Sequence, residues 1–132
     1  MKKVLLILLS LASIVYVSCK KNNNNGSNND GPGEVYGKWK LTEVMEDPGN
    51  GSIGKYQKVS GQVKYLTLDK SGKFEGDAMP ELLTYKILDS VKMEVTNKNY
   101  NQTLIYRYKV SAKSLQINPP CFEGCGYRFV RE

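Results

Sequence analysis

The chain has 132 residues, enough for one domain, and it is rich in tyrosine (nine residues) and glycine (twelve residues). Its formal charge is +6, but the Lys and Arg residues are scattered singly, so a nucleic-acid-binding patch is not expected. The chain has no histidine, the most common metal ligand and general base. No nucleophile, phosphate-loop or zinc motif occurs either, so we expect no enzyme activity, no metal site and no cofactor.

Residues 1–18 have the pattern of a secretory signal peptide. Lys2 and Lys3 form a short positive region, and an apolar run extends from Val4 to Val17. As a helix, this run would span about 21 Å, which is short of the roughly 30 Å apolar core of a membrane. A signal peptide therefore fits better than a membrane-spanning helix.

The apolar run ends on Ser18-Cys19, which resembles the lipobox of bacterial lipoproteins. The resemblance implies that Cys19 is acylated, becomes the mature N-terminus and anchors the chain to a lipid bilayer. Tyr16 stands where that family usually has Leu, Val or Ile, and an ordinary signal peptide with a chance cysteine is the alternative. Lys20 follows Cys19, in place of the Asp linked with inner-membrane retention, which favours the outer membrane of the cell envelope.

Residues 19–33 predict a tether between this anchor and the folded domain. After Cys19 the segment consists of Asn, Gly, Ser, Lys, Asp and Pro, with no apolar side chain. Such a segment cannot offset its chain entropy by burial, so we expect disorder. The folded domain is expected to cover residues 34–132.

The domain begins with a strand over residues 36–44, around the single tryptophan. Trp39 and Leu41 alternate with polar residues, which is the period of a strand with one buried face. The alternation slips at Thr42-Glu43, which predicts a β-bulge that turns Val44 inward. Gly37 has no side chain, and this would allow close approach of another group.

The rest of the domain repeats this pattern in short segments. After a turn-rich loop at 47–52 we expect strands at 55–59, 63–69, 73–75, 83–89, 91–95, 104–110, 115–117 and 127–131. Asp69-Lys70-Ser71-Gly72 is the clearest hairpin turn. Leu83, Tyr85 and Ile87 are expected to share one face of their strand.

Turn signals every 8–12 residues, without a long helix, predict an all-β sandwich or barrel. Short turns between neighbouring strands favour a small antiparallel up-and-down β-barrel of about eight strands, because closure removes exposed strand edges.

Two cysteines remain near the C-terminus if Cys19 carries lipid. In an oxidising compartment Cys121 and Cys125 are expected to form a structural disulfide. A redox or metal pair is the alternative. Three residues separate the two cysteines, however, where a redox motif has two, and no histidine or further cysteine could complete a metal site.

Several features together resemble the lipocalin-like lipoproteins of Gram-negative bacteria. They are the lipobox, the polar tether, Gly37-Lys38-Trp39, the hairpin from Asp69 to Phe74 and the Cys-x-x-Gly-Cys ending at Cys125. The resemblance implies a barrel whose last strand supplies an arginine that stacks on Trp39. Arg128 is the preferred partner and Arg131 is the alternative. The sequence alone does not determine which residues of the last strand point into the barrel. At about 100 residues, the domain is well short of a full lipocalin.

The same resemblance implies a small apolar or amphipathic ligand in the barrel. The candidate ligand-binding residues are Trp39, Leu66, Leu68, Tyr85, Met93, Tyr106 and Tyr108. Core packing is the alternative role for each of them. A protein-interaction module or enzyme inhibitor, acting through the loops Asp47–Ser52 and Gly76–Glu81, is the second functional hypothesis. The oligomeric state does not follow from the sequence.

Overall fold

The computed structural model describes residues 33–46, 49, 54–122 and 124–132. The expected signal peptide, Cys19, the tether up to residue 32 and most of the Asp47–Ser52 loop therefore lie outside the described residues. Within the described part of the chain, no helix is long and apolar enough to cross a membrane.

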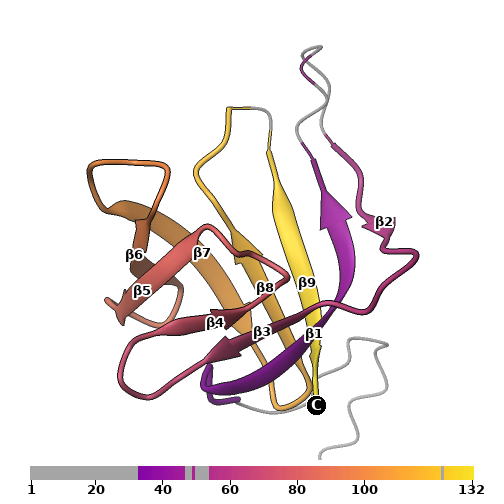
Figure 1. Cartoon of the computed structure of the whole chain (residues 1–132), viewed down its shortest axis with the longest axis horizontal. Coiled ribbons are helices and arrows are strands. Elements are labelled where there is room, and N and C mark those ends of the chain that lie inside the picture. Colours follow the sequence, from indigo (N-terminus) through magenta and orange to yellow (C-terminus); the bar gives the residue numbers. More distant parts are fainter. Residues whose placement is uncertain (1–32, 47–48, 50–53, 123) are drawn as a thin grey trace, which may run out of the picture.

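The described residues form one antiparallel β-sheet that curls into a nearly closed barrel, as the sequence predicts (Figure 1). Its strands are β1 (Gly37–Met45), β2 (Gln57–Lys58), β3 (Tyr65–Leu68), β4 (Phe74–Gly76), β5 (Leu82–Ile87), β6 (Lys92–Asn97), β7 (Leu104–Val110), β8 (Ser114–Asn118) and β9 (Gly126–Arg131). The strand order is β4-β3-β1-β9-β8-β7-β6-β5, with β2 paired to β1 outside this path. The first and last long strands are therefore neighbours.

The barrel closes between β4 and β5, the two strands at the ends of that order. Lys73 forms an isolated antiparallel bridge with Thr84, and the Tyr85 N–H donates to the Gly72 carbonyl at 2.8 Å. Gly72 also ends the predicted hairpin turn: it has a φ of 84°, and its N–H donates to the Asp69 carbonyl at 3.0 Å. This hairpin, which favours glycine because of its positive φ, is thus part of the closure.

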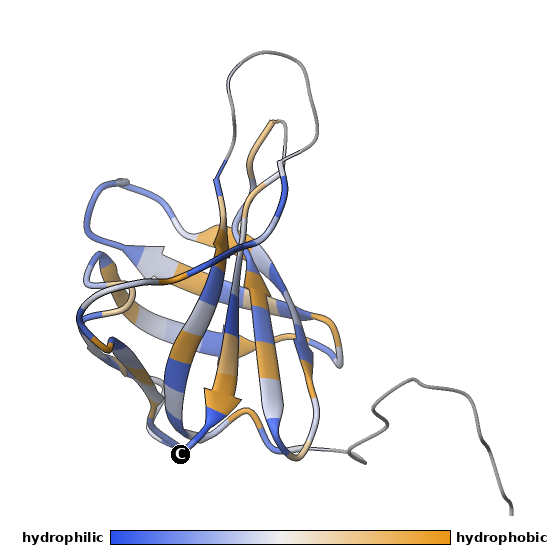
Figure 2. Ribbon diagram, turned by 90° about the vertical axis from the view of Figure 1, so that its right-hand side faces the viewer, coloured by the Kyte–Doolittle hydropathy of each residue, from blue (hydrophilic) through white to orange (hydrophobic). Residues whose placement is uncertain are grey.

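Hydrophobic and hydrophilic residues alternate along the strands (Figure 2). One set of the alternating side chains packs into a common core. In β3, Leu66 and Leu68 are buried, and in β7 the buried residues are Tyr106 and Tyr108. The prediction for β5 is wrong in one respect, because Leu83 is 46% exposed. A register shift between Leu82 and Thr84 turns Leu82 inward instead.

The bulge predicted in the first strand is present. The pairing of β1 with β9 shifts register between Leu41 and Glu43. Val44 is partly buried and packs against the core, consistent with the expected return to the inner face. On the outer face of the same region, Glu43 forms an ion pair with Arg128 at 2.9 Å.

Arg131, and not the preferred Arg128, stacks on Trp39. Its guanidinium carbon lies 4.0 Å from the indole centroid, and Trp39 pairs directly with Arg131 across β1 and β9. Arg128 points outward and lies 3.6 Å above the Tyr56 ring. The assignment of Arg128 is therefore corrected to the alternative, because Phe129 faces the core and side chains two residues apart in a strand share a face.

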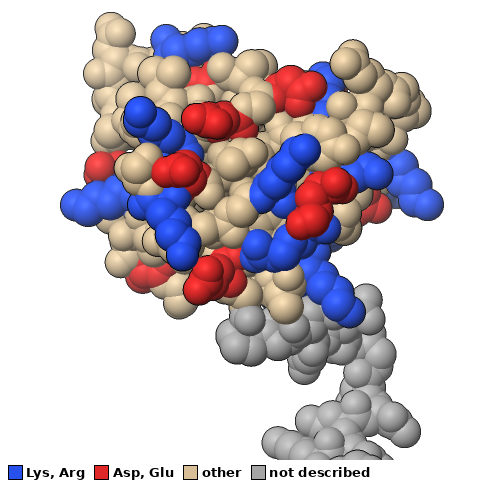
Figure 3. Space-filling model, turned by 60° about the horizontal axis from the view of Figure 1, so that its bottom comes forward, with Lys and Arg blue, Asp and Glu red and all other residues tan. Residues whose placement is uncertain are grey.

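The two ends of the barrel differ. At the closed end, which we define by Trp39, Arg131 and the turns at 69–72 and 88–91, tyrosine hydroxyls bind the turns. Tyr85 donates to the Asp69 carbonyl at 2.6 Å, and Tyr108 donates to the Asp89 carbonyl at 2.8 Å. Lys and Arg are interspersed with Asp and Glu over this end (Figure 3). The open end lies opposite, where β1, β6 and β8 finish.

Candidate functional site

A cavity of about 360 Å³ lies at the open end of the barrel. This volume is at the lower limit of the roughly 300–1,000 Å³ found for small-molecule sites. Its walls come from strand ends that meet there: Met45 at the end of β1, Asn97 at the end of β6, and Leu104 and Tyr106 at the start of β7. Antiparallel order thus brings segments far apart in the chain around one opening.

The wall combines apolar and polar surface. Met45, Leu104, Pro119 and Pro120 supply aliphatic and thioether groups. The polar members are Glu46, Glu81, Asn97, Asn99, Tyr100, Tyr106 and Tyr127. An arrangement of this kind suits an amphipathic molecule, because polar groups orient a ligand while apolar groups remove its surface from water.

Asn97 and Tyr106 form a buried hydrogen-bonded pair within this wall. Asn97 is 4% exposed and Tyr106 is 3% exposed. The Asn97 amide nitrogen donates to the Tyr106 hydroxyl oxygen at 3.4 Å, while the Asn97 side-chain oxygen accepts from the Asn99 N–H at 2.9 Å. Asn97 thereby holds both the β6–β7 turn and the Tyr106 ring.

The Tyr106 hydroxyl hydrogen has no acceptor among the residues that the structure describes. Buried donors are normally satisfied by protein or by water. A polar atom in the cavity would complete this bond. Burial raises the pKa of Tyr106, the charge of Glu81 raises it further, and the hydrogen bond from Asn97 lowers it, so the hydroxyl is a neutral donor at physiological pH.

Tyr127 lies in the field of both glutamates of the wall. Burial raises the pKa of Tyr127, and the charges of Glu81 and Glu46 raise it further. Carboxylates have this effect because a nearby negative charge disfavours the phenolate. Two carboxylates of the wall therefore lie near the ring of Tyr127.

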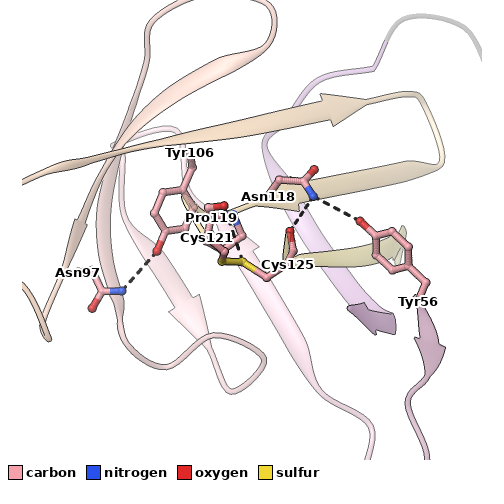
Figure 4. The surroundings of a disulfide bond; sticks show 7 residues. All are labelled: Tyr56, Asn97, Tyr106, Asn118, Pro119, Cys121 and Cys125. Carbon is pink, nitrogen blue, oxygen red and sulfur yellow. Dashed lines mark hydrogen bonds between the residues drawn. A yellow bond between two sulfur atoms is a disulfide. The ribbon is translucent and has the colours of Figure 1, made fainter. Parts of the chain in front are cut away.

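The expected disulfide between Cys121 and Cys125 is present (Figure 4). Both cysteines belong to the lining of the cavity. Their Cα atoms are 5.9 Å apart, within the usual range for a disulfide. Asn118 ties the same loop to the barrel: its side-chain nitrogen donates to the Cys125 carbonyl at 2.9 Å and to the Tyr56 hydroxyl oxygen at 3.4 Å. The disulfide thus supports one wall of the opening.

We expect no free thiol at Cys121 or Cys125 when the oxidised protein is titrated under denaturing, non-reducing conditions. Replacing both cysteines by serine should lower the free energy of unfolding by about 2 kcal/mol, since the bridge closes a short loop in the unfolded chain. Chemical denaturation of the two proteins measures this difference. Two free thiols per chain in the oxidised sample would contradict the disulfide and favour the redox or metal alternative.

Most of the ligand-binding residues predicted from the sequence belong to the packed core and not to the cavity wall. Trp39, Leu66, Leu68 and Met93 are at most 1% exposed and belong to the packed interior. Tyr85 and Tyr108 bind turns at the closed end, as described above. Of the seven candidates, Tyr106 alone borders the cavity.

Several residues of the cavity are not among the sequence candidates. The sequence pattern places Asn97 in a turn and Leu104 and Tyr127 in strands, outside the set of candidate ligand-binding residues. Glu81 belongs to a loop that the sequence suggests for protein interaction and not for a small ligand. Their positions along the strands provide a usable signal. Each residue lies at or next to the start or the end of a strand, and in an up-and-down barrel these particular starts and ends meet at one rim.

Gly37 of the resemblance-based motif lies under the arginine of the closed end. Its φ is 126°, and a Cβ there would come within 2.8 Å of the Arg131 Nη1 atom. The backbone conformation therefore favours glycine, and a larger residue would also displace the Arg131 guanidinium from its place over Trp39. In the part of the chain that the structure describes, no cluster of three or more Cys, Asp or Glu residues could hold a metal ion.

Comparison with protein-family models, with curated proteins and with solved structures finds no match to this chain.

Proposed function

We propose that this chain is a lipocalin-like lipoprotein of the cell envelope that holds a small amphipathic ligand at the open end of its barrel. The observation that carries the proposal is the cavity of about 360 Å³ at that end. A ligand of modest size, with both apolar and polar groups, fits this space.

The chemistry of the wall supports an amphipathic ligand over a purely apolar one. Leu104 and Met45 offer apolar contact, whereas the Tyr106 hydroxyl offers a hydrogen-bond donor with a free hydrogen. Leaving such a buried donor unpaired would cost about 1–3 kcal/mol. A ligand oxygen or a water molecule held with the ligand would satisfy it.

The closed end supports the lipocalin-like part of the proposal. The resemblance implies a Gly-x-Trp motif on the first strand and a stacked arginine on the last, and Trp39 and Arg131 have this arrangement. Their strands are hydrogen-bonded neighbours. Because side chains fill this end, ligand would enter and leave at the other.

The position of the first described residue indicates which end of the barrel would be connected to a membrane anchor. Gly33, the first described residue, lies against the backbone of Ser111 at the closed end. A lipid anchor at Cys19 would therefore connect to the closed end, with the cavity on the opposite side. The ligand would be exchanged with the aqueous compartment or with a partner, on the side away from the tether.

Cys19→Ser is expected to move the protein from the membrane fraction to the soluble fraction, because it removes the acylation site. Cell fractionation and mass spectrometry of the purified chain measure the change. Wild-type protein should pellet with membranes and have a mass raised by acyl chains. A variant that still pellets and keeps the wild-type mass would contradict the lipoprotein assignment.

Filling the cavity tests the binding function directly. Leu104→Trp adds bulk inside the cavity, while Ile105→Trp adds the same group one residue later, where the side chain is 47% exposed and outside the lining. Native mass spectrometry of protein purified from its own membrane should find a small molecule with wild type and Ile105→Trp, and none with Leu104→Trp. Equal recovery from the two variants would place binding elsewhere.

A protein-interaction module is the second candidate, and Phe122 favours it. This residue lies in the disulfide-closed loop at the open end and is fully exposed. In the second loop proposed for this role, Asp77 accepts from the Tyr65 N–H at 2.7 Å and Met79 is 2% exposed, so the loop is held in place. A protein partner that co-purifies with wild type and is lost in Phe122→Ser would support this function.

A further inference from the structure

The open-end cavity differs in charge from the rest of the chain. The chain has 19 Lys and Arg against 13 Asp and Glu. The cavity nevertheless includes Glu46 and Glu81 in its wall and no lysine or arginine. Within residues 33–46, 49, 54–122 and 124–132, no ion pair involves either glutamate.

Lys98, whose backbone is bonded to Glu81, is not among the residues that line the cavity. The Lys98 backbone N–H donates to the Glu81 carbonyl at 2.9 Å, but the Lys98 side chain is outside the lining. The carboxylates therefore border the cavity without a cationic side chain of the lining to balance them. Two negative charges at one opening disfavour an anionic ligand and favour a cationic one.

Aromatic rings stand beside these carboxylates. Tyr100, Tyr106 and Tyr127 all border the cavity. The face of an aromatic ring is negative and attracts ammonium groups, and the interaction strengthens where water is excluded. Carboxylates and tyrosine rings around one opening are thus two independent features that select the same ligand charge.

We propose that the cavity selects ligands that carry an organic ammonium group next to an apolar body. Glu46 and Glu81 would face the positive charge together with the rings of Tyr100, Tyr106 and Tyr127. The apolar wall would contact the rest of the molecule. This inference rests on the proposed function, because it names the ligand class of the same site. It adds a sign of charge that neither the fold nor the resemblance implies.

Three probes of one shape test the inference. 2-Phenylethylammonium, 2-phenylethanol and phenylacetate share a ring and a short chain but carry positive, zero and negative charge. Each is titrated by calorimetry into the full chain held in nanodiscs of zwitterionic lipid, with empty nanodiscs as the blank. We expect the cation to bind at least tenfold more tightly than the alcohol, and the anion to bind more weakly than the alcohol.

Charge variants identify the groups responsible. The double variant Glu46→Gln and Glu81→Gln should lower the affinity for the cation to that for the alcohol. Glu75→Gln is the control for the loss of a carboxylate charge elsewhere on the protein, because Glu75 is exposed on β4 and lies outside the cavity wall. It should leave all three affinities unchanged. Thermal unfolding of each variant verifies that the fold is retained.

The outcomes separate the charge inference from the proposed function. If the three probes bind equally and Leu104→Trp abolishes binding, the cavity is a ligand site without charge selection, and the inference is wrong while the function stands. The inference is also wrong if the glutamine variants keep the preference for the cation. If no probe binds at concentrations up to about 10 mM, which is weaker than millimolar affinity, both the inference and the small-molecule function are wrong.

Discussion

Trp39→Ala is expected to lower the free energy of unfolding by about 3–5 kcal/mol, the cost of removing a large buried side chain. Trp39 is fully buried, and its Nε1–H donates to the Val35 carbonyl at 2.8 Å. Alanine would leave a large space at the closed end and an unpaired carbonyl. Chemical denaturation followed by circular dichroism measures the change without relying on tryptophan emission.

A surface aromatic residue provides the control for this change. Tyr100 is 55% exposed, and Tyr100→Ala should alter the free energy of unfolding by less than about 0.5 kcal/mol. Because Trp39 is the single tryptophan, wild-type emission should be blue-shifted when folded and should shift to the red on denaturation. Emission typical of exposed indole in the folded protein would contradict the buried position of Trp39.

Arg131→Ala is expected to cost about 2–4 kcal/mol of folding free energy, because its charged donors contribute more than neutral hydrogen bonds do. The guanidinium Nε donates to the Ala112 carbonyl at 2.8 Å, and Nη1 donates to the Tyr36 carbonyl at 2.9 Å. Nη2 donates to the Glu34 carbonyl. The same group covers one face of Trp39, so its removal exposes the indole as well as three acceptors.

Arg128→Ala is the matched control, because it removes the same side chain from the same strand. Arg128 is 45% exposed, and its ion pair with Glu43 is open to solvent. Exposed ion pairs contribute about 0–1 kcal/mol, and stacking on Tyr56 adds about 0.5–1 kcal/mol. Arg131→Lys should lose most of the stabilisation, since lysine lacks the planar fork. Equal losses for the two alanine variants would contradict the special role of Arg131.

Local pattern was sufficient for most of the fold. Alternating Leu104, Tyr106 and Tyr108 identified a strand and its inner face, and Gly72 identified a hairpin. The slip at Thr42-Glu43 located the bulge. These features depend on neighbouring residues alone, because strand pleat and turn conformation are set over two to four positions.

Two predictions were wrong because they depended on how a strand pairs with its neighbours in the sheet. Leu83 shares its parity with buried Tyr85, yet a bulge in β5 turns Leu83 outward. The choice of Arg128 over Arg131 required the orientation of β9 between β1 and β8, which is set by partners far away in the chain. Phe129 carried the missing signal, since Arg131 shares its face and Arg128 does not.

The all-β class, the strand positions and the cysteine pair follow from the amino-acid sequence, because alternation, turn residues and cysteine spacing are local properties of the chain. Which residues could meet a ligand depends on the closed barrel instead. Closure filled the interior of the barrel with Trp39, Leu66 and Met93 and left space at the rim near Glu81 and Tyr127. The physical reason is that an inward-facing side chain is core or cavity wall according to what packs against it, and those neighbours come from strands distant in sequence.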